Sequence, residues 1–201
     1  MTAGIASLLK LTIVIYHAET VAPPELLRAE ATASAILRQA GISTAWRSAT
    51  SQDLTLAPDQ IAVHLLSVHP STLAMRTNGY AVLTAEQSYA GISCPAVHAA
   101  AVSLDSDEAI VLGAVIAHEL GHILLGSRDH ATSGVMVTRL REREIQAAAS
   151  GELQFLRSQA HRMRAEVARR IAAGKNVIED LHDPHARTLR SPGGRYTFRP
   201  E

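Results

Sequence analysis

The sequence has very few aromatic residues and a single cysteine. Phe, Trp and Tyr make up 3% of its 201 residues, although hydrophobic residues as a whole make up 47%. We therefore expect a core built from Ala, Leu, Ile and Val. Because Cys94 has no second cysteine to pair with, no disulfide can form within the chain, and the fold does not depend on an oxidising compartment. We interpret Cys94 as an inert thiol rather than a nucleophile.

The sequence also lacks an excess of charge of either sign. Lys and Arg together number 19, as do Asp and Glu, so the formal net charge at pH 7 is zero. Obligate binding to nucleic acid or to an anionic membrane generally needs an excess of positive charge. We therefore expect neither nucleic acid nor a membrane as a partner. Uninterrupted apolar runs of the ~18 residues that a transmembrane helix needs are missing too.

The apolar stretch near the N-terminus, LLKLTIVIY, lacks the features of a signal peptide. Lys10 interrupts it, no basic segment precedes it, and no small-residue cleavage site follows before Glu19. The default expectation is a cytoplasmic protein, although a secreted protein trimmed of its leader would have the same sequence. The sequence makes no prediction of oligomeric state.

Length and composition predict a single domain over residues 1–173, followed by a loose tail over residues 174–201. The end of the tail, SPGGRYTFRPE, is rich in Pro, Gly and Arg. His182 and His185 lie in this tail. We interpret them as solvated side chains rather than as a metal site.

The first part of the domain has the pattern of a strand-helix-strand unit. Leu11–Tyr16 is apolar on both alternations, as expected of a central strand. Apolar residues then recur at helical spacing after Pro23 and Pro24, up to Gly41. Ile42–Arg47 has the pattern of the next strand. A unit of this kind implies parallel pairing of its two strands, and hence an α/β fold.

Further elements follow along the chain. Ile61–Val68, Gly79–Thr84 and Val97–Leu104 are predicted to be strands, with a loop between the last two. The charged stretch Thr138–Ser150 is predicted to be a helix with a solvated face. A second C-terminal helix is predicted to begin near Ser158.

The motif around which the chain is organised is His118-Glu119-Leu120-Gly121-His122, an HExxH pattern. Residues four apart lie on one face of a helix, so both imidazoles can point at one metal ion. Catalytic zinc usually has three protein ligands and keeps one position for water. Glu119 lies beside the pair, where its carboxylate could take a proton from that water. A third ligand must come from elsewhere in the chain.

The helix that carries the motif has clear signals at both ends. Asp105 followed by Glu108 has the spacing of a capping box. The stretch Ala109–Ala117 is almost entirely apolar, so the helix is expected to be buried nearly all round. Gly126 stands where a left-handed residue would end the helix.

His130 is the natural third ligand, because a turn just beyond the helix can bring it back toward the pair. Asp129 is an alternative, since zinc also accepts carboxylate oxygen. His98 is a more distant alternative. His64 and His69 stand alone in the sequence, and single histidines of this kind are usually structural or exposed.

The run HELGHILLGSRDHATSGVM resembles the metzincin clan of zinc endopeptidases, whose HExxH motif continues through a glycine to a third His and then a Met-turn. It is more similar still to a group of small, uncharacterised bacterial predicted zinc proteases with the pattern HExxHxxxGxxxHxxxGxM. This resemblance implies a mixed twisted sheet with an antiparallel edge strand at Gly79–Thr84, an active-site helix and C-terminal helices. It also implies one catalytic Zn²⁺ held by His118, His122 and His130, with Met136 beneath the site.

The leading functional prediction is a zinc-dependent endopeptidase acting on a peptide or protein substrate, with Glu119 as the catalytic base. One alternative is a repressor-cleaving regulatory metallopeptidase, which also carries an HELGHxLL-like helix. Such proteins often have a His four residues after the second ligand, where this chain has Gly126. Another alternative is a zinc-bound interaction module without turnover. Tyr80 and Tyr89 are candidates to stabilise the oxyanion, although packing or surface roles are the simpler interpretation for both.

Overall fold

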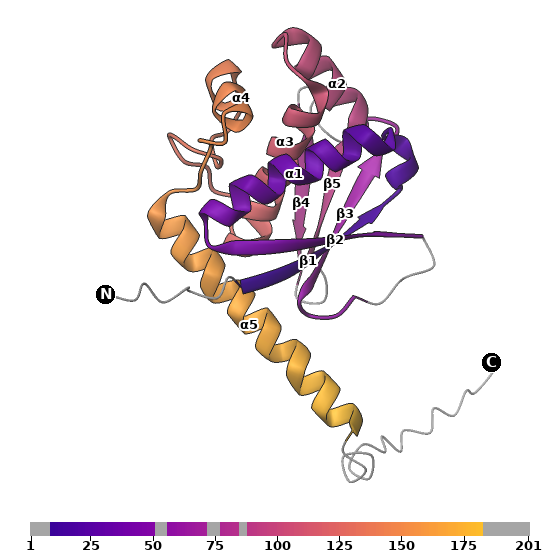
Figure 1. The fold of residues 1–201 in the computed structure, drawn as a ribbon, viewed down its shortest axis with the longest axis vertical. Helices are drawn as coiled ribbons and strands as arrows, with labels where there is room; N and C mark the ends of the chain where they lie inside the picture. The colour runs from indigo at the N-terminus through magenta and orange to yellow at the C-terminus, as the bar shows by residue number, and fades with distance from the viewer. Residues whose placement is uncertain (1–8, 51–55, 72–76, 85–87, 183–201) are drawn as a thin grey trace, which may run out of the picture.

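The protein, described here from a computed structural model, has a five-stranded sheet with helices packed on one of its faces (Figure 1). The structure describes residues 9–50, 56–71, 77–84 and 88–182. The strand order is β2-β1-β3-β5-β4. The strands are β1 (Leu9–Tyr16), β2 (Ile42–Ala49), β3 (Gln60–Leu66), β4 (Gly79–Leu83) and β5 (Ser88–Ser93).

The sheet is parallel except at one edge. β1 pairs in parallel with β2 and β3, and β3 pairs in parallel with β5. β4 is the edge strand and runs antiparallel to β5, with Gly79 opposite Ile92. The α/β class and the antiparallel edge strand are therefore confirmed. The helix α1 (Pro23–Gln39) connects β1 to β2 and begins with the two prolines, as the sequence predicts.

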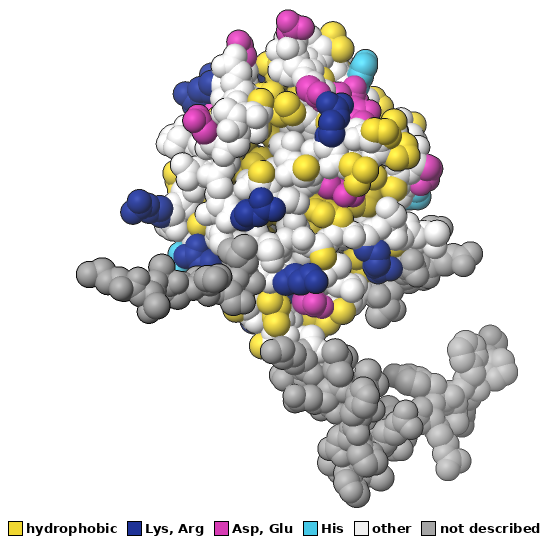
Figure 2. Space-filling view, viewed as in Figure 1, with side chains coloured by type: hydrophobic (Ala, Val, Ile, Leu, Met, Phe, Trp, Pro, Cys, Tyr) yellow, Lys and Arg dark blue, Asp and Glu magenta, His cyan; other side chains and the backbone are white. Residues whose placement is uncertain are grey.

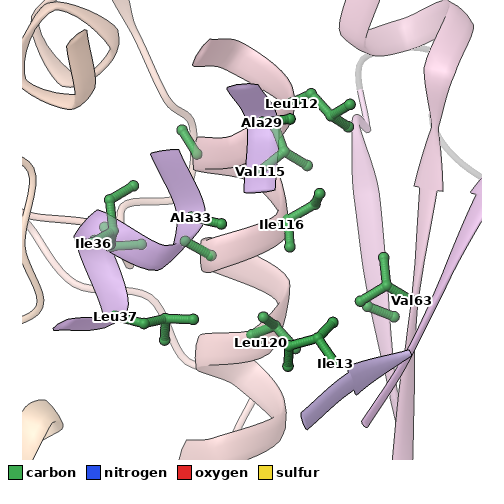
Figure 3. Close-up of a cluster of buried hydrophobic side chains, with 14 of the residues drawn as sticks. Ile13, Ala29, Ala33, Ile36, Leu37, Val63, Leu112, Val115, Ile116 and Leu120 are labelled. Carbon is green, nitrogen blue, oxygen red and sulfur yellow. The ribbon is translucent and has the colours of Figure 1, made fainter. Parts of the chain in front are cut away.

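The helix α3 (Glu108–Leu125) occupies the centre of the molecule, between the sheet and α1 (Figure 3). Ile116 and Leu120 of α3 point toward Ile13 and Val63 of the sheet. Among the described helices α3 alone is apolar and long enough to cross a membrane, and 89% of it lies buried inside the protein, as in a core helix. As expected, Ala, Leu, Ile and Val dominate the core. Among the described residues Phe155 is the single buried aromatic residue of the main cluster, and the partly buried Trp46 packs against that cluster.

The N-terminus of α3 differs from the sequence prediction. Asp107, not Asp105, caps the helix, and its carboxylate accepts a hydrogen bond of 2.8 Å from the backbone N–H of Ala109. Asp107 also pairs with Arg28 of α1. Asp105 has a φ of 47°, a left-handed conformation that belongs to the turn before the helix. The N-cap therefore lies two residues later than the capping-box spacing predicts.

The predicted strand Val97–Leu104 is wrong, because this segment belongs to the helix α2 (Cys94–Ser103). The strand lies just before it, as β5, in the stretch that was expected to be a loop. The hydroxyl of Ser93 caps α2 by accepting a bond from the N–H of Ala96, and a proline stands in its first turn. Val97 and Ala101 are its buried residues, which is helical spacing.

The two C-terminal helices also differ in extent from their predictions. α4 (Glu142–Ala149) begins later than Thr138. α5 (Arg157–His182) continues past Gly174, where the tail was expected to begin. His185 lies outside the described residues. Figure 2 shows basic and acidic side chains interspersed over one face of the molecule, in keeping with the balanced formal charge.

Cys94 is half-buried at the start of α2. Burial, with the nearby Glu108 carboxylate, raises the pKa of its thiol to about 11. The thiol is therefore protonated at neutral pH and is a weak nucleophile.

Replacing Asp107 with alanine is expected to lower the free energy of unfolding by about 1 kcal/mol, because the first turn of α3 loses its cap. Urea denaturation followed by circular dichroism measures this loss. Asp105→Gly serves as the control, since glycine tolerates the left-handed turn and should cost little. An equal loss in both variants would contradict the assignment of the cap.

Candidate metal centre

The structure brings the three predicted ligand histidines together at the C-terminal end of α3. His118, His122 and His130 each offer a ring nitrogen, and these atoms all lie within 4.8 Å of one another. The Nε2 atoms of His118 and His122 are 3.1 Å apart. The rings of His118 and His130 stack with centroids 5.4 Å apart. His118 and His122 are buried, whereas His130 is exposed.

Backbone carbonyls fix the orientation of the two buried rings. Nδ1 of His118 donates to the carbonyl of Val135 at 2.8 Å, and Nδ1 of His122 donates to the carbonyl of Ser127 at 2.9 Å. A carbonyl oxygen can only accept, so in the neutral rings the proton sits on Nδ1 and the lone pair sits on Nε2. Hydrogen bonds of this kind to the far ring nitrogen are typical of metal-ligating histidines.

The spacing of the two Nε2 atoms fits a shared cation. Two unprotonated nitrogens 3.1 Å apart cannot hydrogen-bond to each other, so their lone pairs repel unless a positive charge lies between them. Nitrogens bound to one tetrahedral zinc at about 2.0–2.1 Å would lie roughly 3.4 Å apart. The observed separation is close to that value, and the donor set of three imidazoles suits zinc.

The turn after α3 places His130. Gly126 ends the helix with a φ of 60°, as predicted, and the backbone N–H of Ser127 bonds to the carbonyl of His122. Just after His130, the N–H of Ala131 donates to the carbonyl of Met136 at 2.6 Å. The loop from His130 to Met136 therefore closes on itself beside the site.

The alternative third ligands are engaged elsewhere. The carboxylate of Asp129 accepts a bond of 2.7 Å from the hydroxyl of Ser127, and Asp129 is not part of the three-histidine cluster. His98 lies on α2, where its Nδ1 is 2.6 Å from the Glu108 carboxylate. Among the described residues, His130 is the side chain that joins the helical pair.

The floor of the site depends on close packing at Gly121. A Cβ on this glycine would lie 2.4 Å from the sulfur of Met136 and 2.8 Å from Cε1 of Phe155. Met136 is fully buried, so it fills the space directly under the helix. Sequence reasoning missed Phe155, whose only signal was that the chain has two phenylalanines. Gly134, with a φ of 77°, lets the loop approach the carbonyl of Gln154.

The carboxyl of Glu119, the residue that follows His118 in α3, is buried, with 5% of the residue exposed. Burial raises its pKa to about 8. Its side chain packs against Gly79 at the start of β4. Burial also lowers the pKa of His118, to about 4, and that of His122.

Tyr80 and Tyr89 lie on the opposite face of the sheet from Glu119. Gly79 faces Glu119, and successive residues of a strand point to opposite faces, so Tyr80 points away. Tyr89 is opposite Val82 and therefore shares the face of Tyr80. The two rings meet edge to face, and Tyr89 also contacts His64, which stacks on Tyr16. Neither tyrosine is placed to stabilise an oxyanion at the metal centre.

A cavity of about 640 Å³ lies between the loop 132–134 and the segment 152–157. Phe155 lines this cavity and also packs against Gly121, so the cavity shares a wall with the floor of the site. The described residues around it include both apolar and charged side chains, among them Leu153 and Arg157.

No protein-family model matches the chain, and a search of curated proteins finds no similar sequence.

His130→Ala is expected to lose most of the bound zinc, because two imidazoles alone hold the ion weakly. Asp129→Ala and His98→Ala are the matched controls and should keep about one zinc per chain. Metal content of the purified variants, with chelator competition, gives the comparison. Full zinc in His130→Ala together with loss in Asp129→Ala would assign the third ligand to the carboxylate.

The metal-free protein is expected to lose stability toward both acid and alkaline pH. In the folded protein the pKa of Glu119 is raised from 4.5 to about 8. The contribution of Glu119 to the free energy of unfolding is therefore fully present below pH 4.5 and is lost as the pH rises through 8. In the folded protein the pKa of His118 is lowered from 6.5 to about 4. The contribution of His118 to the free energy of unfolding is therefore fully present above pH 6.5 and is lost as the pH falls through 4.

Glu119→Gln should remove the loss of stability that develops as the pH rises to 8, which is on the order of a few kcal/mol. The loss of stability at acid pH should remain. Urea denaturation of chelator-treated protein across this pH range measures both effects. An alkaline loss that is unchanged in the variant would show that Glu119 does not cause it.

Proposed function

We propose that the protein is a zinc-dependent endopeptidase. The observation that carries this proposal is a set of three histidine nitrogens within 4.8 Å of one another, together with the buried carboxyl group of Glu119, the residue that follows the first of these histidines in α3. A site used only for structure is normally closed by a fourth protein ligand. Among the described residues the cluster has three, which favours a catalytic site.

Glu119 is the residue proposed to move protons. A bound zinc ion supplies a Lewis acid that polarises the scissile carbonyl and makes water more acidic. Glu119 takes one proton from the attacking water and gives it to the nitrogen of the leaving amine, so the carboxylate is regenerated. Its raised pKa suits proton transfer near neutral pH, and a cation close by favours the ionised form that the first step needs.

The edge strand β4 supports a peptide as the substrate. Among the described strands β4 pairs with β5 alone, so it is an edge strand with no strand partner on its other side. An extended peptide can bind there by adding a strand. The start of β4 at Gly79 contacts Glu119, so a peptide added to this strand would run close to the proposed base.

A binding module without turnover is the second candidate, because an open strand edge and a nearby cavity would suffice to hold a peptide. Burial of Glu119 favours hydrolysis over binding alone. A buried carboxylate with a raised pKa is costly for the fold, and peptide binding gives no reason to keep it.

Glu119→Gln is expected to keep about one zinc per chain and to lower peptide hydrolysis by about 10²–10⁴-fold, because it removes the base and keeps all three ligands. Metal analysis combined with cleavage of a diverse peptide library measures both properties. Undiminished hydrolysis in the variant would remove Glu119 from the mechanism. Zinc binding without any hydrolysis by the wild type would favour the binding module.

A further inference from the structure

A side chain at Gly79, the first residue of β4, would crowd two neighbouring side chains. A Cβ built on Gly79 would lie 2.9 Å from Cγ of Glu119 and 3.0 Å from Oε1 of the same side chain. It would also lie 3.0 Å from Cδ1 of Ile92. A methyl group at this position would therefore require a shift of the Glu119 or Ile92 side chain.

The backbone conformation does not explain a glycine at this position. Gly41, Gly126, Gly134 and Gly151 have a positive φ, which favours glycine, but Gly79 does not. Glycine within a strand often marks a site where another group approaches closely. Here the approaching group is the carboxylate proposed to act as the base.

The strand cannot easily move away from Glu119. Gly79 is in register with Ile92 in the antiparallel pair, and the carbonyl of Asn78 accepts a bond of 2.9 Å from the N–H of Ser93. Ser93 is itself buried and caps α2. A side chain at position 79 would therefore displace Glu119 rather than the strand.

We propose that Gly79 is a positioning residue for Glu119: its missing side chain sets the space in which the carboxylate lies between β4 and α3. This role rests on the proposed function. The role of Gly79 gives a specific cause for the position of Glu119, namely the close approach of the edge strand β4 to α3.

The contact itself can be tested without metal and without activity. Gly79→Ala is expected to lower the midpoint of thermal unfolding of the chelator-treated protein. In a Glu119→Ala background the same change should cost much less, because Cγ and Oε1 are gone. If Gly79→Ala fails to fold, the double variant should still fold. An equal loss in both backgrounds overturns the proposal.

The positioning role is tested on the zinc-loaded protein. Gly79→Ala is expected to keep its zinc and to lose on the order of 10- to 100-fold in kcat, with a smaller change in KM, because the base is displaced. Adding Ile92→Val removes Cδ1 on the other side of the new methyl group and should restore part of kcat. Ile92→Val alone is the matched reference for this rescue.

Gly113→Ala controls for a general packing defect. Gly113 lies on the same helix as Glu119 but nearer its N-terminus, away from the site. A Cβ on Gly113 would lie 2.5 Å from the backbone carbonyl oxygen of Ala29 in α1. The substitution should lower stability without changing kcat per bound zinc. If the metal-free variants show that Gly79→Ala costs less in the Glu119→Ala background, but kcat of Gly79→Ala is unchanged, the positioning role is overturned. An inactive wild type overturns the proposed function, and the metal-free variants then still decide whether Gly79 and Glu119 compete for one space.

Discussion

The structure depends above all on the burial of α3. All but two of its residues are buried, and among the described elements α3 contributes the largest number of residues to the main apolar cluster. Its C-terminal half also carries two histidines and a glutamate into that environment. Buried polar groups must find partners, because leaving them unsatisfied is costly. The backbone carbonyls of Val135 and Ser127 satisfy one nitrogen of each histidine, and a shared cation is the partner that suits the other.

Glycines allow the close approaches that this burial requires. At Gly113 a Cβ would meet the backbone of α1, and at Gly121 it would meet Met136 and Phe155. Gly79 serves the same purpose from the other element, because this glycine belongs to the strand β4 and faces Glu119 of α3. With few aromatic residues to fill gaps, the core is built by bringing backbones close together, and small residues at the contact points make this feasible.

The two faces of the sheet have different characters. The face under α1 and α3 belongs to the main apolar cluster, which includes Ile13 and Val63. The opposite face carries a smaller cluster around Val14, next to the stacked rings of Tyr16 and His64. Strand alternation separates the two sets, so an ionisable residue on a strand belongs to the metal side only if its position in the alternation places it there.

The sequence alone determined the elements whose signals are local. The period of α1, the apolar run of α3 with its glycine stop, and the pairing of the histidines four apart on one helical face are all properties of short segments. Local signals misplaced the strand before α2, because a run such as VHAAAVSL is apolar enough for either element. The Ser cap and the proline at its start decided for a helix.

Only the tertiary structure decided which distant groups share the site. His130 and Met136 lie in or at the end of a loop that is held by contacts with the backbone of Gln154, and no local pattern encodes those contacts. The approach of Gly79 to Glu119 depends on β4 lying at the edge beside β5, and strand order is set by the packing of the whole sheet. A side chain's neighbours along a helix follow from the helical repeat, whereas its neighbours across the core follow from how all the elements pack together.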